Sequence, residues 1–170
     1  MGIFPTRILL AIDDSEEAAL ATRRAIDLAD TAGSELYLVH VGQLPNFLIE
    51  GSDIGGFYLG LYEDIERESL EVLRRLSWRV KISGGDVAGA DLRMGNVAEE
   101  IVASAKELEA DLVVMGSRGH GGLWRTIEGS ISDLVVRRAP CAVMTVRGET
   151  TEKQRRFWRR IFSTGSENAT

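Results

Sequence analysis

The chain has 170 residues, 44% of them hydrophobic and 27% charged, which predicts a single globular domain with a sizeable core. No apolar run approaches the roughly 18 residues that a membrane span needs, and the first apolar run, bracketed by Arg7 and Asp13, is too short for a signal peptide. Cys141 is the only cysteine, which excludes an intramolecular disulfide and a thiolate metal cluster and leads us to expect a cytoplasmic protein.

Charge is distributed unevenly along the chain. The formal net charge is −6, and because residues 151–170 carry +3, residues 1–150 carry −9. The strong negative charge of residues 1–150 argues against general nucleic-acid binding. We therefore treat residues 1–149 as one domain and residues 150–170 as a separate basic, amphipathic tail.

Five apolar, β-capable segments alternate with segments of helical periodicity. The predicted strands are 7–13, 35–41, 90–94, 111–117 and 141–147. The predicted helices are 14–32, 61–78, 95–110 and 130–140, and the glycine- and aromatic-rich segment 42–60 is predicted to be a long loop. Short connections in this alternation predict an α/β fold in which helices cover both faces of a parallel sheet.

Several predicted helices carry end signals. Asp14 or Ser15 can cap the first helix, and Gly33 can end it. Asn96, with Glu99 three residues later, has the spacing of a capping box. Pro140 stops the last helix because proline cannot continue it.

A glycine-rich segment, "GSRGHGGLWRTIEGS" (116–130), follows the fourth predicted strand. Glycine in an ordered loop costs backbone entropy, so several together indicate a close backbone approach, most often to phosphate. Gly129 and Ser130 open a helix whose free N–H groups favour an anion. The chain has no Gly-Lys pair, which excludes a Walker loop, and "DDSEE" after the first strand excludes the Rossmann fingerprint. We predict a phosphate site at the carboxyl ends of the strands, where strand order reverses.

The spacing G-x2-G-x9-G-S, met by Gly116, Gly119, Gly129 and Ser130, resembles the ATP-binding signature of universal stress proteins. The stretches "ILLAIDDSEEA", "LYLVHV" and "GSISDLVVRRAPCAVMTVR" extend the resemblance over residues 7 to 147. The resemblance implies a five-stranded, Rossmann-like parallel sheet in the order 3-2-1-4-5. It implies a regulatory protein that binds ATP, or AMP or ADP, with Mg²⁺ as a candidate ion, and that forms a homodimer through its last strand.

The same resemblance implies roles for individual residues. Asp13 would hold the ribose, Val41 would meet adenine through its backbone, and Gly129 to Ser132 would bind phosphates. The full predicted set is Ala11, Ile12, Asp13, Val41, Met115, Gly116, Ser117, Arg118, Gly119, Gly129, Ser130, Ile131 and Ser132. The chain departs from the family at Asp14, where glycine is common, and at Ala142, where proline is common.

Alternatives remain open for several polar residues. Asp13 and Asp14 could hold Mg²⁺, or Asp14 could cap a helix. Arg118 is favoured over Arg125 for neutralising phosphate. His120 has no visible orienting partner, so no catalytic residue and no metal ligand is assigned, although a slow ATP hydrolase or phosphotransferase is an alternative function. His40 is predicted to be a satisfied core residue.

The tail segment "KQRRFWRRIF" (153–162) gathers Phe157, Trp158, Ile161 and Phe162 into one apolar strip flanked by arginines. Such a segment can lie on an anionic membrane or dock on a partner protein, which would make the chain a scaffold. The alternative is a helix packed on its own domain, or a disordered tail.

Overall fold

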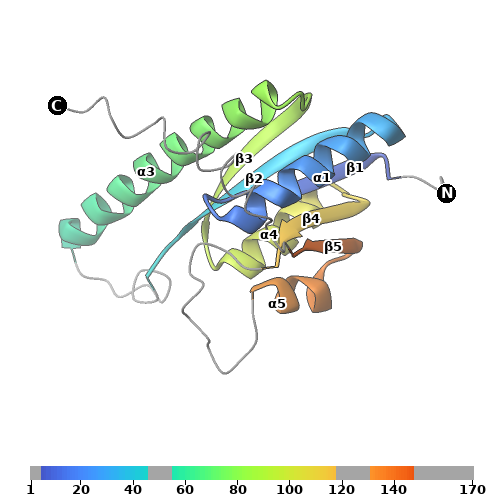
Figure 1. Cartoon of the computed structure of the whole chain (residues 1–170). Helices are drawn as coiled ribbons and strands as arrows, with labels where there is room; N and C mark the ends of the chain where they lie inside the picture. Colours follow the sequence, from blue (N-terminus) through green and yellow to red (C-terminus); the bar gives the residue numbers. More distant parts are fainter. Residues whose placement is uncertain (1–4, 46–54, 118–130, 148–170) are drawn as a thin grey trace.

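The computed structural model describes residues 5–45, 55–117 and 131–147, and these form a sheet of five parallel strands with helices on both faces (Figure 1). The strand order is β3-β2-β1-β4-β5, as predicted. The strands are β1 (Arg7–Ala11), β2 (Glu35–Gln43), β3 (Val87–Gly95), β4 (Leu112–Gly116) and β5 (Ala142–Val146). The helices are α1 (Glu16–Ala32), α3 (Gly55–Ile82), α4 (Val97–Glu107) and α5 (Ile131–Arg138).

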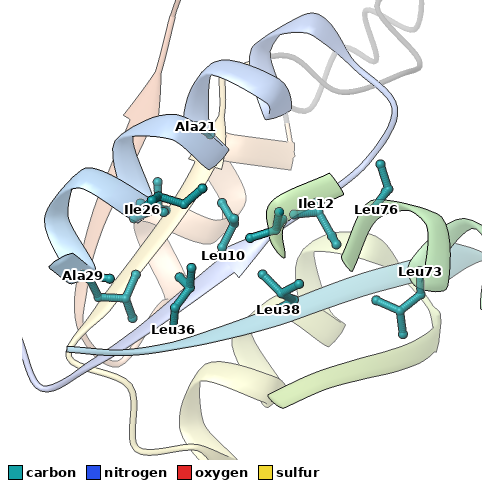
Figure 2. Packing of buried hydrophobic residues seen from close by; sticks show 13 residues of the cluster. Leu10, Ile12, Ala21, Ile26, Ala29, Leu36, Leu38, Leu73 and Leu76 are labelled. Atoms are coloured by element: carbon teal, nitrogen blue, oxygen red, sulfur yellow. The ribbon is translucent and has the colours of Figure 1, made fainter. Parts of the chain in front are cut away.

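Two apolar clusters hold the layers together, one on each face of the sheet. Side chains alternate between faces along a strand, so Ile8 and Leu10 of β1 pack under α1 and α3 while Leu9 packs under α4 and α5. Figure 2 shows the first cluster, in which Leu36 of β2 lies toward Ile26 and Ala29 of α1, and Leu38 lies toward Leu73 of α3. Because both faces are covered, the strands need continuous apolar runs, which the sequence supplies.

Three elements are longer than predicted: β2, expected over 35–41, continues to Gln43, and two others extend further. The helix expected over 61–78 spans Gly55–Ile82, so part of the expected loop is helical. The strand expected over 90–94 spans Val87–Gly95, because parallel pairing with β2 from Leu36 onward extends it through alanine and glycine residues of low strand propensity. The sequence around the extra residues of α3 and β3 does not indicate that they are helical or extended. Packing on neighbouring elements, which is not visible in the local sequence, supplies most of the stabilisation of these residues.

The helix ends follow local chemistry. Ser15, rather than Asp14, caps α1 by accepting a hydrogen bond from Ala18 N at 3.1 Å. Gly33 ends α1 with φ of 64°, a left-handed conformation that favours glycine. Asn96 caps α4 by accepting from the backbone N–H groups of Ala98 and Glu99. The Glu99 carboxylate lies 3.5 Å from the guanidinium of Arg138 on α5, so its side chain links the two helices.

Candidate functional site at the carboxyl ends of β1 and β4

The strand order reverses between β1 and β4, which pair directly, with Leu10 opposite Val114. Just beyond these positions, Ala11, Val41 and Met115 come from three adjacent strands and all belong to the cluster on the α4 face. Met115 is buried, and Ala11 and Val41 are half-buried. Three predicted site residues are therefore brought together on one side of the sheet, where they form an apolar surface at its carboxyl edge.

The turn after β1 is ordered by hydrogen bonds. The carboxylate of Asp13 accepts from the backbone N–H of Ser15 at 2.9 Å. The side chain of Ile12 is buried on the opposite face, and its carbonyl oxygen lies 2.9 Å from Nδ1 of His40. A carbonyl oxygen only accepts, so Nδ1–H of His40 is the donor. His40 is satisfied, as predicted, but it is half-buried at the edge rather than in the core.

Two serines join the end of β4 to the start of α5. Ser132 is buried, and its Oγ donates to the Ser117 carbonyl at 3.1 Å. The Ser117 N–H donates to the Val146 carbonyl at 2.9 Å. The Ser117 hydroxyl is itself buried and has no hydrogen-bond partner within the described part of the chain. A buried, unsatisfied hydroxyl costs free energy and suggests a partner such as a ligand.

Gly116 lies against the first turn of α1. A Cβ at this position would come within 2.9 Å of Ala18 N and of the carbonyl carbon and Cβ of Glu17. Two of these three atoms are backbone, which cannot move aside as a side chain can. The missing side chain at Gly116 is therefore required by helix packing, in addition to any role toward phosphate.

Asp14 makes contacts that the sequence did not reveal. Its two carboxylate oxygens bind Arg75 at 2.5 Å and Arg79 at 3.1 Å, both on α3. Burial lowers the pKa of Arg79, and the neighbouring carboxylate of Asp14 opposes that shift. Asp14 therefore neither caps α1 nor stands as an unbalanced charge beside the site, because two guanidinium groups surround it.

Of the remaining predicted site residues, Ile131 lies within the described ranges and four others do not. Ile131 is 40% exposed at the start of α5. Arg118, Gly119, Gly129 and Ser130 lie outside the described residues, as do His120, Arg125 and the tail 150–170.

Val97 is not in the predicted set of site residues, although its helical spacing predicts a buried position. It lies one residue after the cap of α4 and packs on the same cluster as Ala11 and Val41. Its position where a helix follows a strand end was the available signal. Arg75 and Arg79 gave no such signal, because they lie within a long charged helix.

A cavity of about 330 Å³ lies elsewhere, over β2 and β3 beside α4. At its wall, Arg93 forms ion pairs with both Asp91 and Glu107, and the hydrogen bonds that Arg93 donates to the Glu107 carboxylate raise the pKa of Arg93. Across residues 5–45, 55–117 and 131–147, no group of three or more metal-ligating side chains occurs. In those same ranges, no helix has the length and apolar character required to cross a bilayer.

Comparison with known proteins identifies the family. Residues 5–147 match the model of the universal stress protein family, and the chain belongs to it. A universal stress protein of Methanocaldococcus jannaschii is 30% identical over 146 residues, covering 83% of this chain and 81% of that protein. Another, from Thermus aquaticus, is 34% identical over 142 residues and covers 82% of this chain and 97% of that protein.

Solved structures show the same fold at lower identity. The universal stress protein UspA from Lactobacillus plantarum has a TM-score of 0.69 at 24% identity, covering 86% of this chain and all of that one. A universal stress protein from Archaeoglobus fulgidus in complex with dAMP has a TM-score of 0.59 at 23% identity, with 86% and 100% coverage. An Arabidopsis thaliana family member with AMP bound has a TM-score of 0.56 at 22% identity, with 89% and 99% coverage.

Proposed function

We propose that this chain is a regulatory protein that binds an adenine nucleotide, with ATP as its ligand, at the carboxyl ends of β1 and β4. The observation that carries the proposal is the hydroxyl of Ser117, which is buried and has no hydrogen-bond partner among residues 5–45, 55–117 and 131–147 and which lies directly after β4, at the strand-order reversal. Support also comes from family members from Archaeoglobus fulgidus and Arabidopsis thaliana, whose structures contain dAMP and AMP.

The described residues suit the parts of such a ligand. Ala11, Val41 and Met115 offer an apolar surface of the kind that a purine ring requires. The carboxylate of Asp13, which accepts from Ser15 and so holds the turn, is a group of the kind that accepts hydrogen bonds from ribose hydroxyls. We assign the phosphates to the backbone of the signature residues Gly119, Gly129 and Ser130, and a Mg²⁺ ion would enter with them.

We propose binding with little or no turnover. The residues that we assign to the phosphates, Gly119, Gly129 and Ser130, are of types that do not serve as a general base, and the predicted set contains no histidine or lysine. Purified protein with Mg²⁺ and ATP should therefore release phosphate far more slowly than the ordinary enzymatic range of about 1–10³ per second. Phosphate release within that range would contradict this assignment and favour the hydrolase or phosphotransferase alternative.

The decisive test of the site replaces a signature glycine. Gly129→Val should weaken ATP binding at least about tenfold, equivalent to about 1.4 kcal/mol, because a branched side chain blocks the backbone approach. Isothermal titration calorimetry with ATP and with AMP measures this. Ala88→Val is the control, since Ala88 is exposed on β3 at the far edge of the sheet and is not a predicted site residue. Unchanged affinity in a folded Gly129→Val protein would remove the basis for the phosphate assignment.

We also propose a homodimer formed through β5. This strand is at the edge of the sheet and pairs only with β4 among the described strands. An unpaired edge presents free N–H and C=O groups that another strand can satisfy. The cytoplasmic location, the division at residue 149 and the role of the tail 150–170 remain predictions from the sequence.

A further inference from the structure

The long helix α3 packs on the sheet through only part of its length. Its fully buried residues are Ser69, Leu73, Leu76 and Val80, all toward its C-terminal end. Between Leu59 and Glu68, no residue is buried by the described parts of the chain. In Figure 1 the N-terminal end of α3 extends beyond the sheet. Leu61, Tyr62 and Ile65 are only half-buried, so this segment packs less than the C-terminal part of α3. A helical segment with little packing is only marginally stable in water, so a partner on this segment would stabilise it.

A regular set of residues runs along the side of α3 that faces away from its buried residues. We call this set the outer stripe; its members follow one another at intervals of four, three, four, three and four residues, and they are Gly60, Asp64, Arg67, Glu71, Arg74 and Trp78. This is the heptad spacing of helices that pair side by side, although the central four positions are charged here and not apolar as in a coiled-coil core, so matching of opposite charges would have to set the pairing. All six are exposed, and Trp78 is 61% exposed, which is unusual for a large aromatic residue without a partner.

The outer stripe is complementary to itself when it is reversed. About the position of Ser69, Gly60 matches Trp78, Asp64 matches Arg74, and Arg67 matches Glu71. Each charged residue thus meets the opposite charge, and the indole meets a glycine above which the space is open. The existing pair of Arg67 with Asp64, at 2.9 Å, is mostly exposed and is therefore readily exchanged for another partner.

We propose that the outer stripe binds the α3 helix of a second copy of this chain, antiparallel, with the two-fold axis passing between Arg67 and Glu71 on the exposed side of α3. Such an interface is isologous, because the same surface is used by both copies. It is distinct from pairing at β5, since α3 packs on β2 and β3, and β3 is at the opposite edge of the sheet. One chain would then carry two separate self-complementary surfaces.

Cysteine cross-linking tests the geometry directly. In a Cys141→Ser background, Gly60→Cys combined with Trp78→Cys should give a disulfide-linked dimer under mild oxidation. Either cysteine alone should not, because equivalent positions on antiparallel helices would lie about 27 Å apart at 1.5 Å per residue. The same distance prevents a bond within one chain. Equal linkage in the single and double variants, or none in the double variant, would overturn the proposal.

Charge reversal tests the complementarity. Glu71→Arg, added to the double-cysteine protein, places like charges opposite each other and should lower the cross-linked fraction severalfold. Adding Arg67→Glu restores opposite charges and should recover the cross-link. Asp30→Arg, an equal change of charge on an exposed position of α1, is the matched control and should have no effect. Circular dichroism confirms folding of each variant. A cross-link insensitive to Glu71→Arg, or not recovered by the second change, would contradict antiparallel pairing.

Discussion

At the scale of single residues, two separate constraints favour glycine at position 116. It belongs to the glycine signature, and it also lies where the backbone of α1 leaves no room for a Cβ. Ser117, the next residue, has a buried hydroxyl without a partner in the described structure. The end of β4 therefore combines a residue packed closely on α1, Gly116, with a residue whose buried hydroxyl lacks a partner in the described structure, Ser117.

Gly116→Ala should destabilise the fold by about 1–3 kcal/mol, the usual cost of forcing extra volume into a packed position. The clash involves the backbone of Glu17 and Ala18, so α1 would have to shift. Urea denaturation without nucleotide measures the change. Gly60→Ala, where a Cβ finds open space within a helix, should not destabilise the protein. An unchanged denaturation midpoint in Gly116→Ala would show that α1 moves at no cost.

At the scale of elements, the amino-terminal ends of β1 and β4 are joined by one carboxylate. Asp111, just before β4, accepts hydrogen bonds from the hydroxyl of Thr6 at 2.7 Å and from the backbone N–H groups of Thr6 and Arg7. These bonds favour the charged form, so they hold the pKa of Asp111 below its ordinary value, the Thr6 hydroxyl having the largest effect. The two central strands thereby start in register.

This lowered pKa predicts an acid-dependent loss of stability. A depressed pKa in the folded state contributes stability above the unfolded value, near about 3.9, and that contribution is lost as the pH falls toward the folded pKa. Asp111→Asn should therefore have a lower free energy of unfolding than the parent protein at pH 7. The difference in free energy of unfolding between the two proteins should become smaller in acid. Urea unfolding at pH 7 and pH 3 measures it, with Asp30→Asn on α1 as the control. If the difference in free energy of unfolding between Asp111→Asn and the parent does not change with pH, the lowered pKa of Asp111 does not contribute to stability.

At the scale of the whole molecule, β5 offers an edge for pairing. The Val146 carbonyl accepts from the N–H of Ser117, the residue after β4. Backbone groups alternate along a strand, so the N–H and C=O of Thr145 point away from β4. Thr145 is exposed, and so is the nearby Val136 of α5. A second β5 strand would satisfy the outward backbone groups and cover this edge.

Thr145→Pro should abolish the proposed β5 dimer while preserving the monomer fold, because proline removes an outward N–H and is tolerated on edge strands. Sedimentation equilibrium should show a lower mass for the variant, and circular dichroism should be unchanged. The cross-link between positions 60 and 78 should persist, since it depends on α3 alone. A variant that retains the parent mass would show that assembly does not use the β5 backbone.

Features with short-range causes were predictable from the sequence by itself. Alternating apolar runs and helical periods determined the α/β class, and caps at Ser15, Gly33 and Asn96 determined where helices begin or end. Each of these signals depends on a few neighbouring residues, so it can be recognised without knowledge of the fold. The signature glycines identified the family, although Gly119 and Gly129 lie outside the described residues and their roles remain predictions.

Only the tertiary structure decided what depends on distant parts of the chain. The partners of Asp14 are 61 and 65 residues away on α3, and no local pattern specifies such a pair. The convergence of Ala11, Val41 and Met115 depends on strand register and on which face each side chain takes. The packing of Gly116 on α1 and the buried hydroxyl of Ser117 follow from the same long-range arrangement, because burial and contact are properties of packed elements and not of sequence neighbours.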